Sequence, residues 1–330
     1  MALLSPQAKP AKAPAAANQF VASRLRTFEQ VRVVSLVGSP SASLFAVGQE
    51  DKTVRVMDAS KLQTVWTLTG HPQPCYGLAF SHDGKLLATG DDSARIFIWD
   101  MKTGKKIREF SRDRGHRRGI QTLQFSPDNK KIASVGKDGQ IMIWNTSGGH
   151  PIATIVQVGV SFYGAEFLPS GSLVSGTLEG SVHLFEGKTF KSVASMPTPN
   201  KSGIFAVSLN PTGTVAYAAS RDGRVLVYDI KTRQRINGLT AHSDWTINTA
   251  MSPNGRVLAS SSNDMTVKFW DTKTLKPLFG LDQTSPIGSP VAFTGNGKYF
   301  VTSSVGDALQ VYQITPPQGA VAAAPVKKKK

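Results

Sequence analysis

Residues 252–271 read Ser252-Pro-Asn-Gly-Arg-Val-Leu-Ala-Ser-Ser-Ser-Asn-Asp-Met-Thr-Val-Lys-Phe-Trp-Asp271, and their pattern recurs throughout the chain. The segment begins with Ser-Pro-Asn-Gly, whose residues favour the backbone angles of turns. Residues 257–261 then predict a strand, and a short polar turn leads to a second apolar run that ends in Trp270-Asp271. The segment therefore predicts two strands joined by a turn.

The end of this segment has six counterparts. A bulky apolar residue, usually followed by an acidic one, occurs at Met57-Asp58, Trp99-Asp100, Trp144-Asn145, Phe185-Glu186, Tyr228-Asp229, Trp270-Asp271 and Tyr312-Gln313. Successive copies are 41 to 45 residues apart. Each copy has a strand and a turn before it, and most have a more polar fourth strand after it, such as residues 106–110. Seven four-stranded units at this period predict an all-β, seven-bladed propeller.

The last unit has no fourth strand of its own, because Thr315-Pro-Pro-Gln-Gly319 breaks the chain after Tyr312. Near the N-terminus, Arg24-Leu-Arg-Thr-Phe-Glu29 has the character of the fourth strands. We expect this N-terminal strand to complete the last blade, which removes the free sheet edges. A single propeller is therefore expected over residues 20–315. Residues 1–19, an Ala/Pro/Lys tail, and residues 316–330, a tail ending in lysines, are expected to be disordered.

The chain resembles the WD40-repeat family in the number, period and internal order of these units. In that family, a buried hydrogen-bonded set of His, Ser or Thr, Asp and Trp stiffens a blade. The resemblance implies one such set in blade three and another in blade six. They consist of His116, Ser134, Asp138 and Trp144, and of His242, Ser260, Asp264 and Trp270.

The set in blade two is expected to be incomplete. His71, Thr89 and Trp99 match the family pattern, but Ser93 occupies the position of the aspartate. The other blades lack the histidine. Such a divergent ring is still expected to fold, because adjacent blades share a continuous apolar core.

The sequence contains no arrangement typical of a catalytic or metal site. Its histidines lack the close His or Cys spacing of metal ligands, and the aspartates of the repeats are interpreted as turn formers. The single cysteine, Cys75, excludes an internal disulfide and agrees with a reducing compartment. We expect a non-enzymatic cytoplasmic protein with no metal and no cofactor. No segment resembles a membrane span, so no membrane insertion is expected.

The clearest candidate binding feature is the loop between blades two and three. Arginine grips carboxylate or phosphate through paired hydrogen bonds, and Trp and Arg are frequent at interface hot spots. By resemblance to WD40 rings, further residues share the face of this loop. The expected partner-binding residues are Arg112, Arg114, Arg117, Arg118, Lys52, Lys137, Lys201, Arg221 and Trp245. The alternatives are a solvated charged loop and, for Trp245, packing against its own blade.

A net charge of +16 indicates acidic partners. The leading hypothesis is a scaffold that assembles proteins, chiefly acidic ones, or RNA and ribonucleoprotein through this basic face, as a monomeric ring within a hetero-complex. The alternative is a protein-only structural subunit of a larger complex, whose charge serves solubility or an acidic protein partner. Basic turns at 102–106, 130–131, 231–235 and 273–276 are expected on the opposite face.

Overall fold

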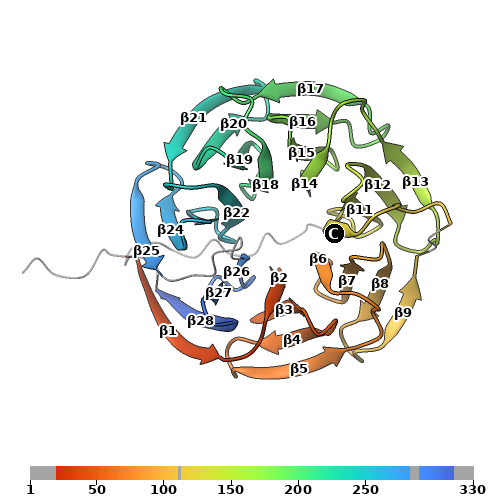
Figure 1. The fold of residues 1–330 in the computed structure, drawn as a ribbon, viewed down its shortest axis with the longest axis vertical. Coiled ribbons are helices and arrows are strands. Elements are labelled where there is room, and N and C mark those ends of the chain that lie inside the picture. Colours follow the sequence, from red (N-terminus) through yellow and green to blue (C-terminus); the bar gives the residue numbers. More distant parts are fainter. Residues whose placement is uncertain (1–19, 111–112, 283–289, 316–330) are drawn as a thin grey trace, which may run out of the picture.

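The computed structural model describes residues 20–110, 113–282 and 290–315. These residues form seven four-stranded antiparallel sheets that stand as blades around a central channel (Figure 1). Every regular element within them is a strand, so the predicted all-β, seven-bladed propeller is confirmed. Among these residues there is no helix of the length and hydropathy needed to cross a membrane.

In blades one to four, chain order runs from the channel to the rim. Blade one comprises β2 (Val33–Gly38), β3 (Leu44–Gln49), β4 (Val54–Asp58) and β5 (Gln63–Leu68). Blade two comprises β6 (Cys75–Phe80), β7 (Leu86–Asp91), β8 (Ile96–Asp100) and β9 (Lys106–Glu109). Blade three comprises β10 (Ile120–Phe125), β11 (Lys131–Gly136), β12 (Ile141–Asn145) and β13 (Pro151–Ile155). Blade four comprises β14 (Phe162–Phe167), β15 (Leu173–Thr177), β16 (Ser181–Phe185) and β17 (Ser192–Pro197).

Blades five and six follow the same order, whereas blade seven combines both ends of the chain. Blade five comprises β18 (Ile204–Leu209), β19 (Val215–Ser220), β20 (Arg224–Asp229) and β21 (Gln234–Thr240). Blade six comprises β22 (Thr246–Met251), β23 (Val257–Ser262), β24 (Thr266–Asp271) and β25 (Pro277–Asp282). Blade seven comprises β26 (Val291–Phe293), β27 (Tyr299–Ser304), β28 (Ala308–Thr315) and, outermost, β1 (Val21–Phe28).

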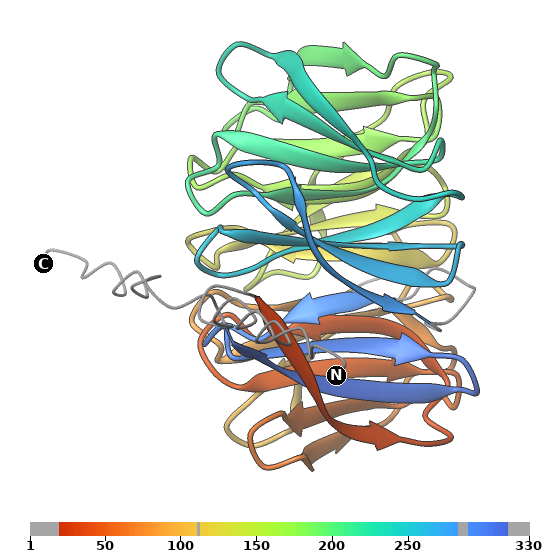
Figure 2. The same cartoon turned by 90° about the vertical axis from the view of Figure 1, so that its left-hand side faces the viewer.

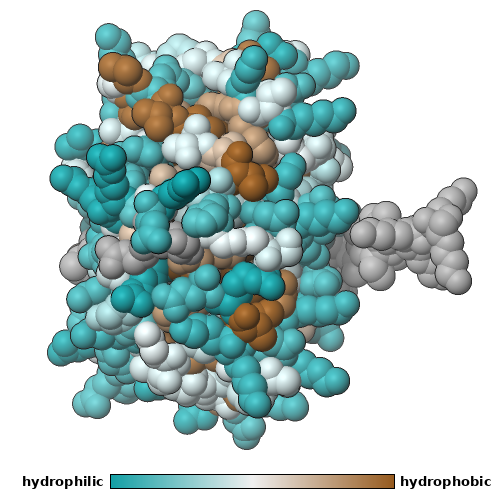
Figure 3. Space-filling model, turned by 90° about the vertical axis from the view of Figure 1, so that its right-hand side faces the viewer, coloured by the Kyte–Doolittle hydropathy of each residue, from teal (hydrophilic) through white to brown (hydrophobic). Residues whose placement is uncertain are grey.

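The core lies between the blades. The third strands carry continuous apolar runs, such as Ile96–Trp99 in β8, because both of their faces are covered by neighbouring blades. At one such junction the Phe110 ring, from blade two, stacks on the Trp144 ring of blade three at a centroid distance of 5.2 Å. The outer strands are more polar, and Figure 3 shows that apolar residues on the rim form small separate patches among hydrophilic ones. Each blade thus depends on its neighbours for burial.

The ring is closed by the N-terminal strand, as predicted. Strand β1 pairs antiparallel with β28, from Val21 opposite Thr315 to Phe28 opposite Leu309. Figure 2 shows β1 running along the last blade. Phe20 is 5% exposed and packs against the Phe269 ring of blade six at 5.2 Å. The two ends of the propeller are therefore held together by backbone pairing and by apolar contact.

Candidate functional site

The hydrogen-bonded sets of blades three and six lie buried inside their blades. In blade three, His116 Nε2 lies 2.7 Å from Ser134 Oγ, and Trp144 Nε1 donates to the same oxygen at 2.8 Å. His116 Nδ1 lies 2.9 Å from Asp138 Oδ1. The set in blade six has the same bonds. Its distances are 2.8 Å for His242 to Ser260, 2.9 Å for Trp270 to Ser260 and 3.1 Å for His242 to Asp264.

The expectation of an incomplete set in blade two is wrong. His71 contacts Thr89 at 2.6 Å, and its Nδ1 lies 3.0 Å from the buried carboxylate of Asp91, at the end of β7. The equivalent position in blade three is Gly136, where a Cβ atom would lie 2.4 Å from His116 Nδ1. The carboxylate can therefore reach the histidine nitrogen from the strand end, as Asp91 does, or from the turn, as Asp138 does.

Burial by itself raises the pKa of Asp91, but hydrogen bonds from His71, the Arg95 amide and Ser93 together lower it by more. The pKa of Asp91 therefore lies below the ordinary value. Asp91 is therefore ionised and fully paired inside blade two. These three sets engage His71, His116 and His242, which are three of the six histidines. Among the described residues, no group of three His, Cys, Asp or Glu side chains could hold a metal ion.

The arginine-bearing loop between blades two and three lies on the same end of the ring as the turns between second and third strands. Its backbone is bonded to the turn between β11 and β12, because Arg117 N donates to Asp138 Oδ2 at 3.0 Å and Lys137 N donates to Gly119 O at 2.7 Å. Arg114, Arg117 and Arg118 are exposed. Arg112 lies outside the described residues.

The predicted lysines of this face are spread around the ring. Lys52 and Lys201 are exposed residues in turns of blade one and of the loop between blades four and five. Lys137 is engaged by its neighbours, since Nζ lies 2.6 Å from Asp92 Oδ1 and 4.7 Å from the centre of the Tyr76 ring. Lys137 thus lies beside the arginine-bearing loop but is paired with Asp92, whereas Lys52 and Lys201 lie in other parts of the ring.

A cluster of aromatic side chains lies at the end of the channel that carries the interblade loops and the turns between second and third strands. We call this end the channel mouth. Trp245 is 38% exposed, and its ring lies 5.7 Å from that of Phe205, which in turn lies 5.5 Å from that of Tyr163. The guanidinium of Arg221 stacks on the Trp245 ring at 4.4 Å. We call Trp245, Phe205, Tyr163 and Arg221 the aromatic cluster; it brings together two predicted residues, Trp245 and Arg221.

Tyr163 and Phe205 were not predicted as site residues. They occupy the same position, the second residue of the first strand, in adjacent blades four and five. Aromatic side chains at that repeated position were a signal in the sequence. Phe205 packs against Trp245, and Tyr163 packs against Phe205, which are contacts between neighbouring blades that only the ring arrangement reveals.

Among the described residues, the face that carries the channel mouth has more acidic than basic side chains, contrary to the expected basic face. Its described turns and loops contain the basic residues Arg32, Lys52, Arg95, Arg114, Arg117, Arg118, Lys137, Lys201 and Arg221. They also contain the acidic residues Glu29, Glu50, Asp51, Asp92, Asp113, Asp138, Glu179, Asp222, Asp244, Asp264 and Asp307. Ion pairs such as Arg32 with Glu50 at 3.2 Å neutralise part of this charge locally. The face therefore has a mixed charge with exposed aromatic residues.

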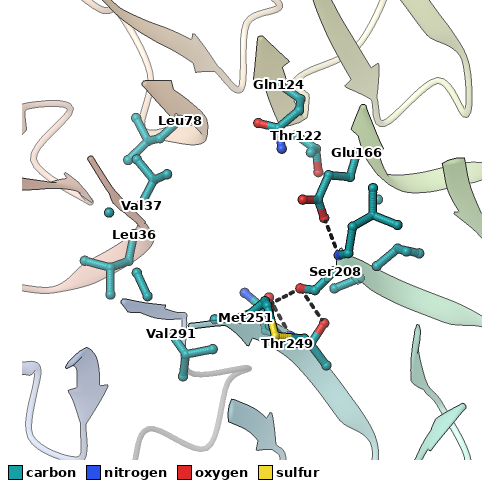
Figure 4. Close-up of a pocket in the computed structure, with 18 of the residues that line it drawn as sticks. Leu36, Val37, Leu78, Thr122, Gln124, Glu166, Ser208, Thr249, Met251 and Val291 are labelled. Carbon is teal, nitrogen blue, oxygen red and sulfur yellow. Dashed lines mark hydrogen bonds between the residues drawn. The ribbon is translucent and has the colours of Figure 1, made fainter. Parts of the chain in front are cut away.

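The channel itself is a cavity of about 980 Å³ lined by the first strands (Figure 4). Its wall combines apolar side chains with a polar sector around Gln124, Ser208 and Thr249. Glu166 belongs to this sector and accepts a hydrogen bond from Leu209 N, in the next blade, at 3.0 Å. Burial raises its pKa to about 8, despite that hydrogen bond. Glu166 is a further residue that sequence reasoning missed.

Glu166→Gln is expected to make the protein more stable than the wild type at high pH. The folded pKa of about 8 lies above the ordinary 4.5, so the wild type loses stability as the pH rises through this interval. The amide keeps the bond to Leu209 N and does not ionise. We expect equal thermal stability at pH 5 and a gain of about 2 kcal/mol at pH 9, after allowing for water in the channel. Glu179→Gln, at an exposed glutamate, is the control, and a gain independent of pH would contradict the assignment.

Known proteins resemble parts of this chain. The family model described as "WD domain, G-beta repeat" matches residues 62–100, 104–145, 190–229 and 233–271. Apoptotic protease-activating factor 1 of Rattus norvegicus is 36% identical over 81 residues, which is 24% of this chain and 6% of the relative. Nuclear distribution protein nudF of Aspergillus terreus is 32% identical over 81 residues, 24% of this chain and 18% of the relative.

A guanine nucleotide-binding protein subunit beta of Zea mays is 31% identical over 78 residues, which is 23% of this chain and 20% of that protein. The matched segments thus span a fifth or less of these relatives' own lengths. Each of the four matched repeats covers the outer strand of one blade and the three inner strands of the next, as residues 62–100 cover β5 of blade one and β6 to β8 of blade two. The chain belongs to the WD40-repeat β-propeller family.

Proposed function

We propose that this protein is a non-enzymatic scaffold that binds a partner protein over the aromatic cluster at the channel mouth. WD40 propellers generally bind other proteins. The maize relative is, by its name, a subunit of a larger protein. The observation that carries the proposal is the exposed Trp245 ring, held between the Phe205 ring and the Arg221 guanidinium.

This arrangement suits a protein partner for two reasons. Trp and Arg are enriched among residues that dominate binding energy, and Trp245 is fixed in place by its neighbours before any partner arrives. Exposed apolar residues surround the same face, namely Tyr76, Val158, Leu178, Met265 and Val305. A mixed rim of charges around an apolar centre is typical of protein interfaces.

The chemistry of the partner follows from the cluster. Arg221 offers a guanidinium to a carboxylate, while the Trp245 ring offers an apolar surface beside it. We propose a partner segment with an apolar or aromatic residue next to an acidic one. The acidic partner of the sequence-based hypothesis is therefore narrowed to one acidic residue of the partner that contacts Arg221.

Trp245→Ala and Arg221→Ala are each expected to weaken partner binding by at least tenfold, because each removes a central contact, worth about 2 kcal/mol at a hot spot. Tagged full-length protein is expressed in its native source, and co-purifying proteins are compared between the wild type and the variants. Binding of the partner so identified is then measured with purified components.

The matched control is Phe279→Ala, which removes an exposed aromatic side chain of the outer strand β25. It is expected to retain every partner. Because the contact is mainly apolar, binding should persist between about 50 and 200 mM salt. A partner profile that is the same for the wild type, Trp245→Ala and Arg221→Ala would refute the proposal.

A further inference from the structure

The face opposite the channel mouth carries an excess of basic residues. It is built from the turns between first and second strands and between third and fourth strands. The basic residues of these turns, all exposed, are Lys61, Lys85, Lys102, Lys105, Lys130, Lys188, Lys191, Lys231, Arg233, Arg256, Lys273, Lys276 and Lys298. The acidic residues in or beside the same turns are Asp58, Asp83, Asp100, Asp128, Glu186, Asp229 and Asp271. We call this surface the lysine face.

The acids of the lysine face serve the turns. Asp100 accepts hydrogen bonds from the backbone N and the hydroxyl of Thr103, at 2.8 and 2.9 Å. Asp229 accepts the same pair of bonds from Thr232. These bonds point the carboxylates into their own turns, while the neighbouring lysines extend into solvent. The described part of this face contains one recorded ion pair among these residues, Lys85 with Asp83 at 3.6 Å.

The basic residues gather where two turns of one blade lie side by side. In blade two, Met101 N donates to Lys85 O, which places Lys85 beside the turn of Lys102 and Lys105. In blade six, Thr272 N donates to Arg256 O, which places Arg256 beside the turn of Lys273 and Lys276. Each of these blades therefore presents three cations on one end of the ring.

The lysine face also lacks the apolar residues found elsewhere on the molecule. Exposed large apolar side chains of the described residues lie in the outer strands, such as Ile107 in β9 and Phe279 in β25, or near the channel mouth, such as Trp245. None lies in the turns of the lysine face. A protein interface normally requires a buried apolar centre, and a membrane-bound surface gains from inserted apolar side chains.

We propose that the lysine face binds the phosphodiester backbone of a nucleic-acid duplex, independently of its sequence. Lysine ammonium groups neutralise phosphates as point charges without reading bases. No exposed Phe, Tyr or Trp side chain lies in these turns to stack on unpaired bases, which favours a duplex over a single strand. The nucleic-acid contact expected on the arginine-bearing face is thus assigned to the opposite face.

This inference goes beyond the proposed function, because it concerns a separate surface and a different class of partner. A protein held at the channel mouth and a duplex held on the lysine face would occupy opposite ends of the ring. The protein would then connect its protein partner to nucleic acid. Changes to one face should leave binding at the other intact, so the two proposals can fail independently.

The test is fluorescence anisotropy with the full-length protein and labelled 20-base-pair duplexes of mixed sequence, one of RNA and one of DNA. At 50 mM salt we expect the wild type to bind at least one of them. Affinity should fall steeply as salt rises to 200 mM, because bound counterions are released from the duplex. The two duplexes show which backbone is preferred, and tight binding of either supports the proposal.

The decisive variant is Arg256→Glu/Lys273→Glu/Lys276→Glu, on blade six. We expect duplex affinity to fall at least thirtyfold and the slope of log K against log salt to flatten by about two to three, as for three lost phosphate contacts. The matched control, Lys52→Glu/Arg117→Glu/Arg118→Glu, changes the net charge equally on the channel-mouth face. It is expected to lose less than threefold.

A second variant changes Lys327 to Lys330 to serine, because these lysines could bind phosphate by themselves. It is expected to keep most of the affinity. The proposal is overturned if only this variant loses binding, or if both triple variants lose it equally. It is also overturned if the wild type binds neither duplex at 50 mM salt, including the case in which it binds vesicles containing phosphatidylserine instead. Trp245→Ala is expected to bind the duplexes like the wild type.

Discussion

Ser134→Ala is expected to destabilise the protein by about 3 kcal/mol, although the substitution removes a single oxygen. The Ser134 side chain is fully buried, and its oxygen joins two rings: it accepts a hydrogen bond from Trp144 Nε1 and contacts His116 Nε2. Alanine would leave both nitrogens buried without a partner. Each unmet group costs about 1 to 3 kcal/mol, because no water can replace the lost bond.

The matched control is Ser134→Thr, because blade two places Thr89 at the same position and bonds it to Trp99 and His71. Threonine keeps the hydroxyl and is expected to recover most of the lost stability. Chemical denaturation of the two variants and the wild type measures the difference. Equal loss in the alanine and threonine variants would mean that packing, and not the shared hydroxyl, determines the effect.

The regular part of the fold could be predicted because each blade repeats one local pattern. A strand that is covered on both faces must be apolar along its length, so Ile96–Trp99 and its counterparts mark the third strands in the sequence. Their spacing then determines the number of blades. The closing strand was predictable for a related reason: the last repeat has no fourth strand, and residues 24–29 match one.

The sequence did not reveal a hydrogen bond whose partner can come from more than one position in the repeat. Blade two was expected to lack its carboxylate because Ser93 stands where blades three and six have aspartate. Asp91 supplies it from the strand end instead, two residues earlier. A fixed column in a repeat alignment cannot show that side chains from two backbone positions reach the same histidine nitrogen.

The sign of the charge on each face also depends on the ring. Four arginines in one loop are conspicuous in the sequence, but acids from other parts of the ring add to the same face: Glu50 and Asp307 pair with Arg32, and Asp92 pairs with Lys137. The lysines of the opposite face are scattered over many turns and become one surface only when the blades close. Local density of charge along the chain was therefore a poor guide to the charge of a face.

The closing strand makes the other large contribution to stability. Strand β1 supplies the fourth strand of blade seven, while Phe20 is buried against Phe269 of blade six. Without them, β28 becomes an exposed sheet edge, and the contact from the N-terminal strand to blade six is lost. The cost includes that of emptying a buried phenylalanine site, about 3 to 5 kcal/mol, and a whole row of backbone hydrogen bonds.

Deletion of residues 2–28 is therefore expected to abolish cooperative folding or to yield aggregates, whereas deletion of residues 2–19 should leave the melting temperature within a few degrees of the wild type. Circular dichroism melting and size-exclusion chromatography distinguish these outcomes. A synthetic peptide of residues 20–30 should restore a cooperative transition when added to the longer deletion, because it can pair with β28 in the register of β1. If the longer deletion melts like the wild type, strand β1 contributes little to stability, and the interfaces between blades alone must hold the ring closed.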